Sequence, residues 1–252
     1  QPAITNEGIK NIRIPLPPLQ EQIRIADILS RTESLIAKRK ESIRLLDDLV
    51  KSMFLDMFST DKSIDWETTP IENLALDEKG SMRTGPFGSD LLHDEFTDEG
   101  DVKVLGIDNV VNNRFEQGGP RFITFEKYEK LKRYRVYPGD VLITIMGTNG
   151  RSVVVPSYIP LSINTKHIAA ITLKQNVANP TFLSYSIVND PSVLKQIALR
   201  TRGAIMNGLN LTIIKSLQIK LPPVELQNKF ASVVEKVEAT KVKYRESLSE
   251  LE

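Results

Sequence analysis

The sequence predicts an α+β protein: a globular domain with a mixed or antiparallel sheet, flanked by two long helices that form an antiparallel coiled coil. One segment occurs twice, since residues 9–47 align without a gap on residues 214–252 at a constant offset of 205. Both copies read as a short strand, a Pro-Pro pair and a heptad helix. The residues between them alternate strand-like runs with turn signals, which indicates a separate globular domain.

Composition narrows the class of protein. Of 252 residues, 40% are apolar and 26% charged, which is typical of a soluble, well-cored protein. No apolar run approaches the roughly 18 residues of a membrane helix and no signal segment follows Gln1, so we expect a cytoplasmic protein. The absence of Cys and the presence of only two His argue against disulfides and a zinc site. Because residue 1 is not Met, we expect a fragment or a processed product.

The first long helix is predicted over residues 20–58, after a Pro-Pro linker that ends the segment 1–19. Apolar residues recur there at heptad spacing, and the second copy continues the register, with Arg39 and Lys241 as polar intrusions. The predicted coiled-coil and subunit-interface residues are Leu29, Ile36, Ile43, Leu46, Val50, Met53, Phe230, Val234, Val237, Tyr244 and Leu248. About 39 residues at ~1.5 Å each give a rod of ~58 Å, longer than a small domain is wide. The alternative is a pair of ordinary core helices.

The globular domain is predicted over residues 60–208, and residues 209–252 repeat the strand, Pro-Pro and helix. Strands are expected at residues 102–107, 121–125, 140–146, 152–156 and 168–173, and helices at residues 126–132 and 181–199.

Charge is distributed unevenly along the domain. Residues 61–120 carry 5 Lys or Arg against 14 Asp or Glu, whereas residues 121–208 carry 12 against 4. Such polarisation indicates a face that binds a polyanion. The alternative is two lobes whose charges neutralise each other.

Patterns that would indicate catalysis are weak. Asp65, Asp77, Glu78 and Lys79 imitate the carboxylates and lysine of a metal-dependent nuclease, but charged residues at this spacing arise often by chance. The tetrapeptide at residues 179–182 resembles the N-P-P-F of amino-methyltransferases, yet a loop that starts a helix explains it better. The run at residues 147–152 lacks the lysine of a phosphate loop. We therefore predict no catalytic apparatus.

A nucleic-acid surface is better supported. Residues 127–137 interleave five basic residues with three Tyr, and four short polar loops combine small residues with Arg or Lys. Glycine lets a backbone approach a duplex closely, while Asn, Arg and Lys can read base edges. The predicted DNA-binding residues are Arg83, Gly85, Phe87, Ser89, Lys127, Lys132, Arg133, Arg135, Asn149, Arg151, Asn164, Lys166, His167, Arg200, Arg202 and Asn207. Taken singly, each loop also reads as an exposed turn with a solvated charge.

Together these motifs resemble a known family over essentially the whole chain. "IRIPLPPLQEQIRIADIL", its second copy "LQIKLPPVELQNKFASVV", and "TGPFGSDL", "YPGDVLITIMGTNGR" and "NGLNLTIIKSLQIKLPP" are similar to the DNA-specificity subunit of type I restriction-modification systems. The resemblance implies that residues 60–208 are a target-recognition domain. The helices would then be the central (20–58) and distal (209–252) conserved regions. The family has two recognition domains, so residues 1–8 would be the end of a truncated first one, and the chain a C-terminal half.

The resemblance also implies a non-catalytic subunit that reads half of a bipartite DNA target and docks methyltransferase and restriction subunits through its helices. Neither cofactor nor metal is expected on this chain, with S-adenosylmethionine, ATP and Mg²⁺ on the partner subunits. A fragment with exposed heptads could also form a homodimer. Two alternatives stay open: a helical assembly module that does not itself bind DNA, and the nuclease discussed above.

Overall fold

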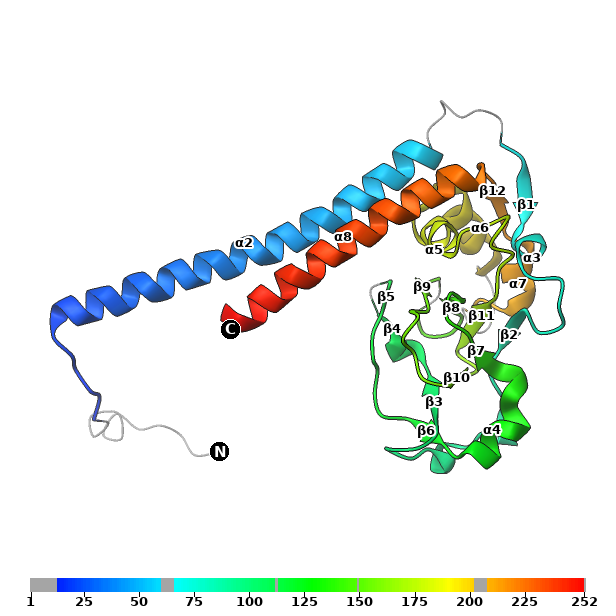
Figure 1. The fold of residues 1–252 in the computed structure, drawn as a ribbon, viewed down its shortest axis with the longest axis horizontal. Helices are drawn as coiled ribbons and strands as arrows, with labels where there is room; N and C mark the ends of the chain where they lie inside the picture. The colour runs from blue at the N-terminus through cyan, green and yellow to red at the C-terminus, as the bar shows by residue number, and fades with distance from the viewer. Residues whose placement is uncertain (1–12, 60–65, 112, 149, 202–207, 252) are drawn as a thin grey trace. The chain divides into compact units, whose positions relative to one another are not determined.

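The chain folds into two compact units. The computed structural model describes residues 13–59, 66–111, 113–148, 150–201 and 208–251. The helical unit comprises residues 1–47 and 239–252, and the globular unit comprises residues 48–238. Two long helices, α2 (Leu19–Phe58) and α8 (Val224–Leu251), contribute residues to both units (Figure 1). The domain predicted over residues 60–208 lies inside the globular unit, which also includes the inner ends of both helices.

Both long helices begin beside a Pro-Pro pair. The Pro18 carbonyl accepts hydrogen bonds from Glu21 N (2.9 Å) and Gln22 N (3.1 Å), and the Pro223 carbonyl accepts equivalent bonds from α8. Proline suits this position because the first N–H groups of a helix have no partner within it. No Gly or Pro follows before Phe58, so α2 continues for 40 residues. The prediction of a helix over residues 20–58 is confirmed.

Polar side chains join the two helices in the helical unit. Lys241 of α8 is 1% exposed and forms an ion pair with Asp47 of α2. The guanidinium of Arg39 lies 4.7 Å from the centre of the Tyr244 ring. Residue numbers fall along one helix as they rise along the other, so the pairing is antiparallel. The predicted antiparallel coiled coil is confirmed, and both polar intrusions have partners across the seam.

Burial along the predicted seam differs within the helical unit. Five of the predicted residues are half-buried, namely Ile36, Ile43, Leu46, Tyr244 and Leu248. Leu29, in contrast, is 58% exposed, and it belongs to a run of exposed apolar residues that includes Ile23, Ile28 and Leu35. Leu29 therefore faces solvent and is not part of an intramolecular seam.

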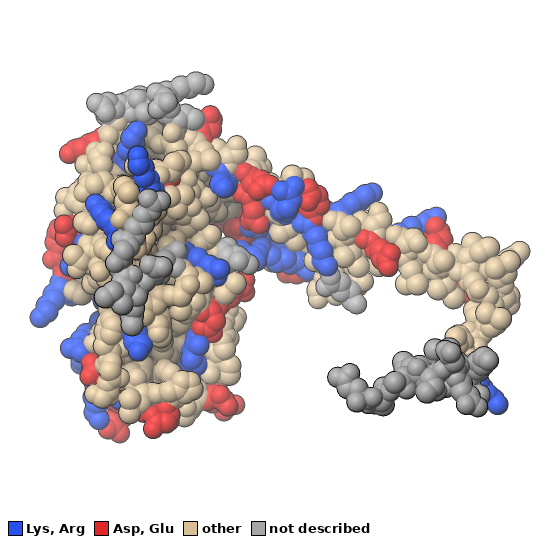
Figure 2. Space-filling model, turned by 180° about the vertical axis from the view of Figure 1, so that it is seen from behind, with Lys and Arg blue, Asp and Glu red and all other residues tan. Residues whose placement is uncertain are grey.

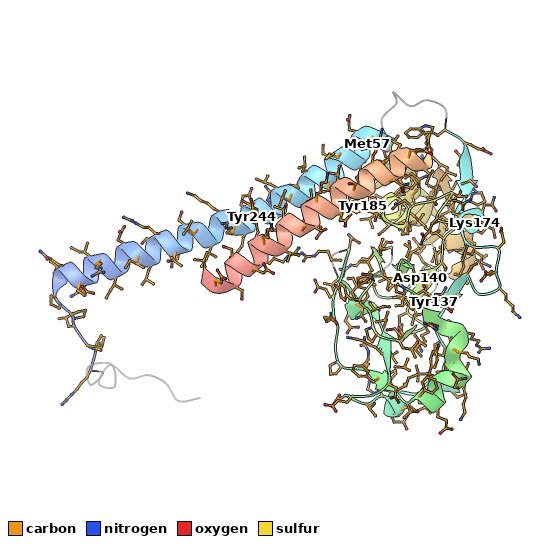
Figure 3. The ribbon with its side chains drawn as sticks, in the orientation of Figure 1. Met57, Tyr137, Asp140, Lys174, Tyr185 and Tyr244 are labelled. Carbon is orange, nitrogen blue, oxygen red and sulfur yellow. The ribbon has the colours of Figure 1, made fainter. Side chains whose placement is uncertain are left out.

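In the globular unit the inner helix ends enter an aromatic core. Phe54 and Phe58 of α2 and Phe230 of α8 are each at most 3% exposed. The ring centres of Phe54 and Phe230 are 5.5 Å apart, and those of Phe58 and Phe182 are 5.0 Å apart. Tyr185, which is labelled in Figure 3, contacts the same rings. Four other predicted seam residues belong here, with Val50 and Val234 buried and Met53 and Val237 half-buried.

Two four-stranded sheets form the middle of the globular unit. The first is antiparallel and has the order β2 (Met82–Thr84), β11 (Ile168–Ile171), β8 (Val141–Thr144), β9 (Ser152–Val154). The second is mixed and has the order β6 (Phe122–Ile123), β3 (Val102–Leu105), β10 (Ser162–Asn164), β7 (Arg135–Val136), with β3 and β10 parallel. Two-stranded ribbons join β1 (Thr68–Pro70) to β12 (Gln218–Lys220) and β4 (Val110–Val111) to β5 (Arg114–Phe115). The α+β prediction with a mixed or antiparallel sheet is confirmed.

The first sheet is buried on both faces. Val141 and Ile143 belong to the core formed with the helices, whereas Leu142 between them packs in the core shared with the second sheet. This alternation follows from the two-residue period of a strand. Figure 1 shows the resulting layers, with α5 (Pro180–Asn189) and α6 (Pro191–Thr201) on one side and the second sheet on the other.

The remaining elements are short. They are α3 (Ile71–Leu74), η1 (Gly88–Asp90), η2 (His93–Glu95), η3 (Ile107–Asn109), α4 (Phe125–Leu131), η4 (Lys132–Tyr134) and α7 (Leu211–Ser216). The helix predicted over residues 181–199 is divided at Asp190, because Pro191 cannot supply an N–H to a continuing helix. Asn179 accepts hydrogen bonds from Thr181 N and Phe182 N, which confirms that this tetrapeptide starts a helix. No helix among the described residues is long and apolar enough to cross a membrane.

Candidate nucleic-acid interface

Three polar loops meet at one end of the first sheet. Strands β2 and β8 finish at this end, and β9 and β11 begin there, because the four strands are antiparallel. The connecting segments 85–90, 145–151 and 164–167 therefore come together, and we refer to them as the loop end. All three were predicted to contact DNA.

Main-chain contacts hold these loops against one another. Gly85 N donates to the Thr165 carbonyl (3.3 Å), and Ile145 N donates to the His167 carbonyl (2.9 Å). A Cβ atom at Gly85 would lie 2.0 Å from the Asn164 carbonyl oxygen, so only glycine allows this approach. The predicted contact residue Gly85 is accordingly buried, and it serves to bring two loops together.

The loop 145–151 is closed by Thr144. Gly150 N donates to the Thr144 carbonyl (3.0 Å), and Arg151 N donates to the Thr144 hydroxyl (3.1 Å). Gly150 has a φ of +82°, which a residue with a Cβ rarely adopts. Its missing side chain would point at Ile197 of α6 (3.8 Å), so α6 passes beside this loop, and Arg200 lies one turn further on. The predicted residues Asn149, Arg202 and Asn207 lie outside the described residues.

A fourth segment, η4, joins the loop end. β7 pairs with β10 in antiparallel register, which brings the preceding η4 alongside the loop that follows β10. Arg133 of η4 forms an ion pair of 3.2 Å with Asp90 in the first loop. Six predicted residues are exposed in this region, namely Phe87, Ser89, Lys132, Arg133, Arg135 and Lys166, and Arg151 and His167 are half-buried. Most of the predicted contacts therefore lie on connected segments at one end of the domain.

Arg83 corrects the prediction. Its side chain is 7% exposed and forms an ion pair with the fully buried carboxylate of Asp140. It also donates to the Arg135 carbonyl (2.6 Å) and the Thr172 hydroxyl (3.0 Å). The guanidinium is fully engaged inside the domain, because a buried charge needs such partners. Arg83 holds strands together and does not face a ligand.

Asn164 is a second correction. Its side chain is 0% exposed, and its amide nitrogen donates to the Ile168 carbonyl (2.9 Å). This bond bridges the two ends of the loop 164–167, so Asn164 shapes the loop. It leaves Lys166, which is exposed, as the outward side chain.

Lys127 and the uneven distribution of charge need revision as well. The Lys127 ammonium lies 2.5 Å from the Glu95 carboxylate. This is one of five ion pairs among the described residues that link the acidic half of the domain to the basic half. Figure 2 shows Lys and Arg side chains spread over one face in ones and twos, with Asp and Glu among them. The two halves do not form separate lobes, because their strands are interleaved in the second sheet. Charges of the two halves therefore pair in part, as the alternative expected, but within one domain and not between two lobes.

Two further cations, Arg114 and Lys79, were not among the predicted DNA-binding residues. Arg114 lies at the β4–β5 hairpin, whose Asn113 accepts a hydrogen bond from Ser152 N (3.3 Å) at the start of β9. The Asn-Asn pair between two short apolar runs was a usable hairpin signal. Lys79, considered only for a nuclease, lines a pocket with Tyr137.

Of the carboxylates considered for a nuclease, those that the structure describes do not form a metal site. Asp77 pairs with Lys174 (2.6 Å), and Asp65 lies outside the described residues. Among the described residues no three His, Cys, Asp or Glu gather as metal ligands.

The surroundings of two groups near the loops lower their pKa values. Burial, aided by the neighbouring Lys166, lowers the pKa of His167 below its ordinary 6.5. Burial tends to raise the pKa of Asp108, but hydrogen bonds from Arg121 and Gly119 N outweigh it, so the pKa is lowered overall. At neutral pH the loop end therefore carries its positive charge on Lys and Arg.

Comparison with solved structures identifies the class of fold. One similar chain was solved in work on the complex assembly and conformational transition of the type I R-M system. The alignment with it covers 99% of the present chain, with a TM-score of 0.64 and 19% identity. The present chain also matches the HsdS subunit from Thermoanaerobacter tengcongensis (TM-score 0.56, 17% identity) and the S subunit from M. genitalium (TM-score 0.61, 16% identity). It spans 60%, 60% and 58% of those chains. The fold is that of a specificity subunit.

Sequence comparison identifies the family. The model for the type I restriction modification DNA specificity domain matches residues 1–45 and 65–252, and the chain belongs to this family. It is 23% identical over 255 residues to the MjaVIII specificity subunit of Methanocaldococcus jannaschii. It is 22% identical over 259 residues to the EcoBI specificity subunit of Escherichia coli. The alignments cover 94% and 93% of this chain but only 58% and 53% of those relatives.

Proposed function

We propose that this chain recognises one half of a bipartite DNA target as part of a type I restriction-modification complex. The observation that carries the proposal is the loop end, where hydrogen bonds and an ion pair join three loops and η4 from distant parts of the sequence. The family of the chain and the specificity subunits it resembles support the same function.

The loop end has the side chains that direct readout needs. Lys166 and Ser89 are exposed, and Arg151 is half-buried at the base of its loop. Lys and Arg can donate to the O6 and N7 atoms of guanine in the major groove, and the exposed ring of Phe87 (52%) can contact a thymine methyl group. The short Gly-containing loops allow the backbone to approach the groove closely.

The helices would connect recognition to the rest of the complex. The exposed apolar residues of α2, Leu29 among them, offer docking area for methyltransferase subunits, and through these for restriction subunits. S-adenosylmethionine, ATP and Mg²⁺ would be bound by those partners, with this chain non-catalytic in the cytoplasm. In the absence of partners the same residues would support a homodimer.

Helix length would set the separation of the half-sites. The 40 residues of α2 extend ~60 Å at ~1.5 Å per residue, or ~17 base pairs. Insertion of one heptad after Ile36, with a matching heptad in α8, should lengthen the spacer of the target by about three base pairs. Methylation mapping that gave an unchanged spacer would contradict this role of the helices.

Methylome sequencing tests the main proposal. A host that expresses the full system should show one bipartite methylated motif. The double variant Arg151→Ala/Lys166→Ala should lose or relax one half of that motif and leave the other intact, because each base contact contributes about 1–3 kcal/mol of discrimination. Arg200→Ala/Arg202→Ala should weaken duplex binding with a smaller salt dependence.

Two results would count against the proposal. Complete insensitivity of both half-sites to the loop variants would mean that the loop end does not read DNA. Absence of duplex binding by the assembled complex at any salt concentration would favour a helical assembly module instead.

A further inference from the structure

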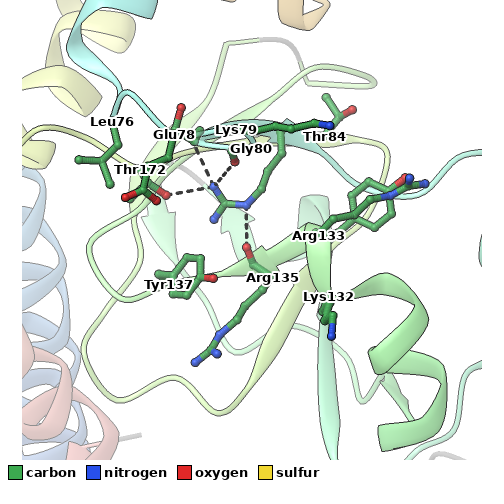
Figure 4. Close-up of a pocket in the computed structure, with 13 residues that line it drawn as sticks. Leu76, Glu78, Lys79, Gly80, Thr84, Lys132, Arg133, Arg135, Tyr137 and Thr172 are labelled. Atoms are coloured by element: carbon green, nitrogen blue, oxygen red, sulfur yellow. Dashed lines mark hydrogen bonds between the residues drawn. The ribbon is translucent and has the colours of Figure 1, made fainter.

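A pocket whose lining includes several basic side chains lies beside the loop end. It has a volume of about 980 Å³ and lies between the segment Leu76–Thr84 and the segment Lys132–Tyr137. Five of its lining residues are basic, namely Lys79, Arg83, Lys132, Arg133 and Arg135, and one is acidic, Glu78 (Figure 4). Thr84, which ends β2, adjoins the loop end, and Arg133, which pairs with Asp90, belongs to it. The pocket is therefore continuous with the surface proposed to read DNA.

A buried ion pair fixes the backbone along one wall of this pocket. Arg83 Nε donates to the Arg135 carbonyl (2.6 Å), and Tyr137 N donates to Asp140 Oδ2 (2.8 Å). Since Arg83 and Asp140 also pair with each other, they clamp both sides of Val136. Figure 3 shows Tyr137 and Asp140 next to each other, and Figure 4 shows the hydrogen bond to the Arg135 carbonyl as a dashed line. Both side chains are buried, so neither Arg83 nor Asp140 is open to a ligand.

The clamp orients two side chains that remain accessible. Arg135 is exposed and lies 4.8 Å from the centre of the Tyr137 ring, which is 43% exposed. Arg135 makes no ion pair with any residue that the structure describes, unlike Lys132 with Glu129 and Arg133 with Asp90. An arginine stacked on a ring has lost much of its side-chain freedom before binding, so less entropy is lost when a ligand binds.

We infer that the stacked Arg135 and Tyr137, held in place by the Arg83–Asp140 ion pair, form a binding site for a phosphodiester of the DNA backbone. Arg135 supplies the charge-assisted hydrogen bonds, and the Tyr137 ring packs against the adjoining sugar. Arg83 and Asp140 act as positioning residues. The inference rests on the proposed function. The contact with phosphate would fix the position of the domain on the duplex and add affinity for DNA, while the loops would discriminate between bases.

The chemistry of the pocket favours a phosphate over a base edge. Arg135, Lys79 and Lys132 are donors only, and their positive charges attract the formally charged phosphate, whereas the edge of a base carries no formal charge. The guanidinium of Arg135 matches a phosphate by two parallel N–H bonds. Arg135 lies next to the loop end. A DNA strand whose bases are read by the loops would continue past this position.

The salt dependence of duplex binding tests the inference. The full chain is titrated with random-sequence duplex at several KCl concentrations, and fluorescence anisotropy gives the slope of log K against log salt. Arg135→Ala should reduce the magnitude of this slope by about 0.9 and weaken binding about five- to tenfold at ~0.1 M salt, because one phosphate contact is lost. The loss should be the same on two unrelated duplexes.

Three further variants make the result specific. Arg135→Lys should restore the slope and leave binding about two- to threefold weaker, because lysine retains the charge and loses the fork and the stack. Tyr137→Leu should weaken binding with an unchanged slope, because no charge is removed. Lys220→Ala, an exposed lysine on β12, is the matched control and should leave the slope of the wild type.

Each outcome has a definite meaning. An Arg135→Ala slope equal to that of the wild type and of Lys220→Ala would overturn the inference, and the proposed function would stand if Lys166→Ala still weakened binding. A loss that differed between the two duplexes would also overturn it, because Arg135 would then read bases. Failure of the wild-type chain and the assembled complex to bind duplex would instead remove the proposed function itself.

Discussion

The inner and outer parts of the same two helices use one heptad pattern in different ways. In the globular unit, Phe54, Phe58 and Phe230 are at most 3% exposed and pack among the rings of α5. In the helical unit, the helices meet through Lys241 with Asp47 and Arg39 with Tyr244, and Leu29 is 58% exposed. A heptad spacing therefore tells which side of a helix is apolar, but the partner decides whether that side is buried.

The difference predicts where stability resides. Aromatic rings that bury most of their area contribute several kilocalories per mole, whereas exposed apolar residues contribute little until a partner covers them. We expect the globular unit to determine the unfolding transition, with the outer helix ends adapted to assembly.

The largest effect should come from the aromatic core. Phe54→Ala should lower the free energy of unfolding by about 3–5 kcal/mol, because it removes a fully buried ring that contacts four others. Leu29→Ala, on the same helix, should change it by less than about 0.5 kcal/mol. Urea unfolding of both variants gives the comparison. Equal losses would show that the outer helix is as firmly packed as the inner end.

A smaller loss is expected at the buried ion pair of the globular unit. Asp140→Asn retains an acceptor for Tyr137 N but leaves the Arg83 guanidinium without a counter-charge in the interior. We expect a loss of about 3 kcal/mol in the free energy of unfolding. Arg133→Ala, which breaks the exposed pair with Asp90, is the control and should cost less than about 1 kcal/mol. Near-equal losses of unfolding free energy in the two variants would mean that burial does not strengthen the contribution of the Arg83–Asp140 pair to stability.

The corresponding pair in the helical unit should matter less for stability. Lys241 is buried, but Asp47 is 55% exposed and can be solvated when its partner is lost. Lys241→Leu should therefore change the free energy of unfolding by no more than about 1 kcal/mol, because an apolar seam residue offsets the lost pair. Denaturant unfolding, with Lys241→Ala as the cavity-forming comparison, measures this. A loss above about 2 kcal/mol would give the pair a structural weight like that of Arg83 and Asp140.

The sequence predicted the elements whose signals are local. The long helices, the start of α5 at Asn179 and five of the strands follow from heptads, caps and β-branched runs, each readable within a short window. The strand β12 was predicted as part of the repeated strand, Pro-Pro and helix, but its partner β1 was not, because residues 68–70 form a strand only where the chain brings them beside residues 218–220.

The candidate site was predicted only in part, and for a physical reason. Residue type shows that Arg83, Asn164 and Lys166 are polar, but not which way each side chain points. Arg83 lies on β2, in a sheet that is buried on both faces, and its partner Asp140 is 57 residues away. The carboxylate that neutralises Arg83 could not be assigned without the register of β2, β11 and β8. Lys166, at the tip of a loop, needed no such partner to be recognised.

The smallest effect on stability should come from His167 and should appear when the pH is lowered. Because burial lowers the pKa of His167 in the folded protein, the unfolded chain binds a proton more readily than the folded chain. The stabilising contribution of neutral His167 is therefore complete above about pH 6.5, the ordinary pKa of histidine, and is lost as the pH falls through the lowered pKa. His167→Gln cannot titrate, so its Tm should decline less than that of the wild type between about pH 7 and about pH 5. His93→Gln is the control, and a parallel decline of Tm in wild type and His167→Gln would mean that His167 titrates alike in both states.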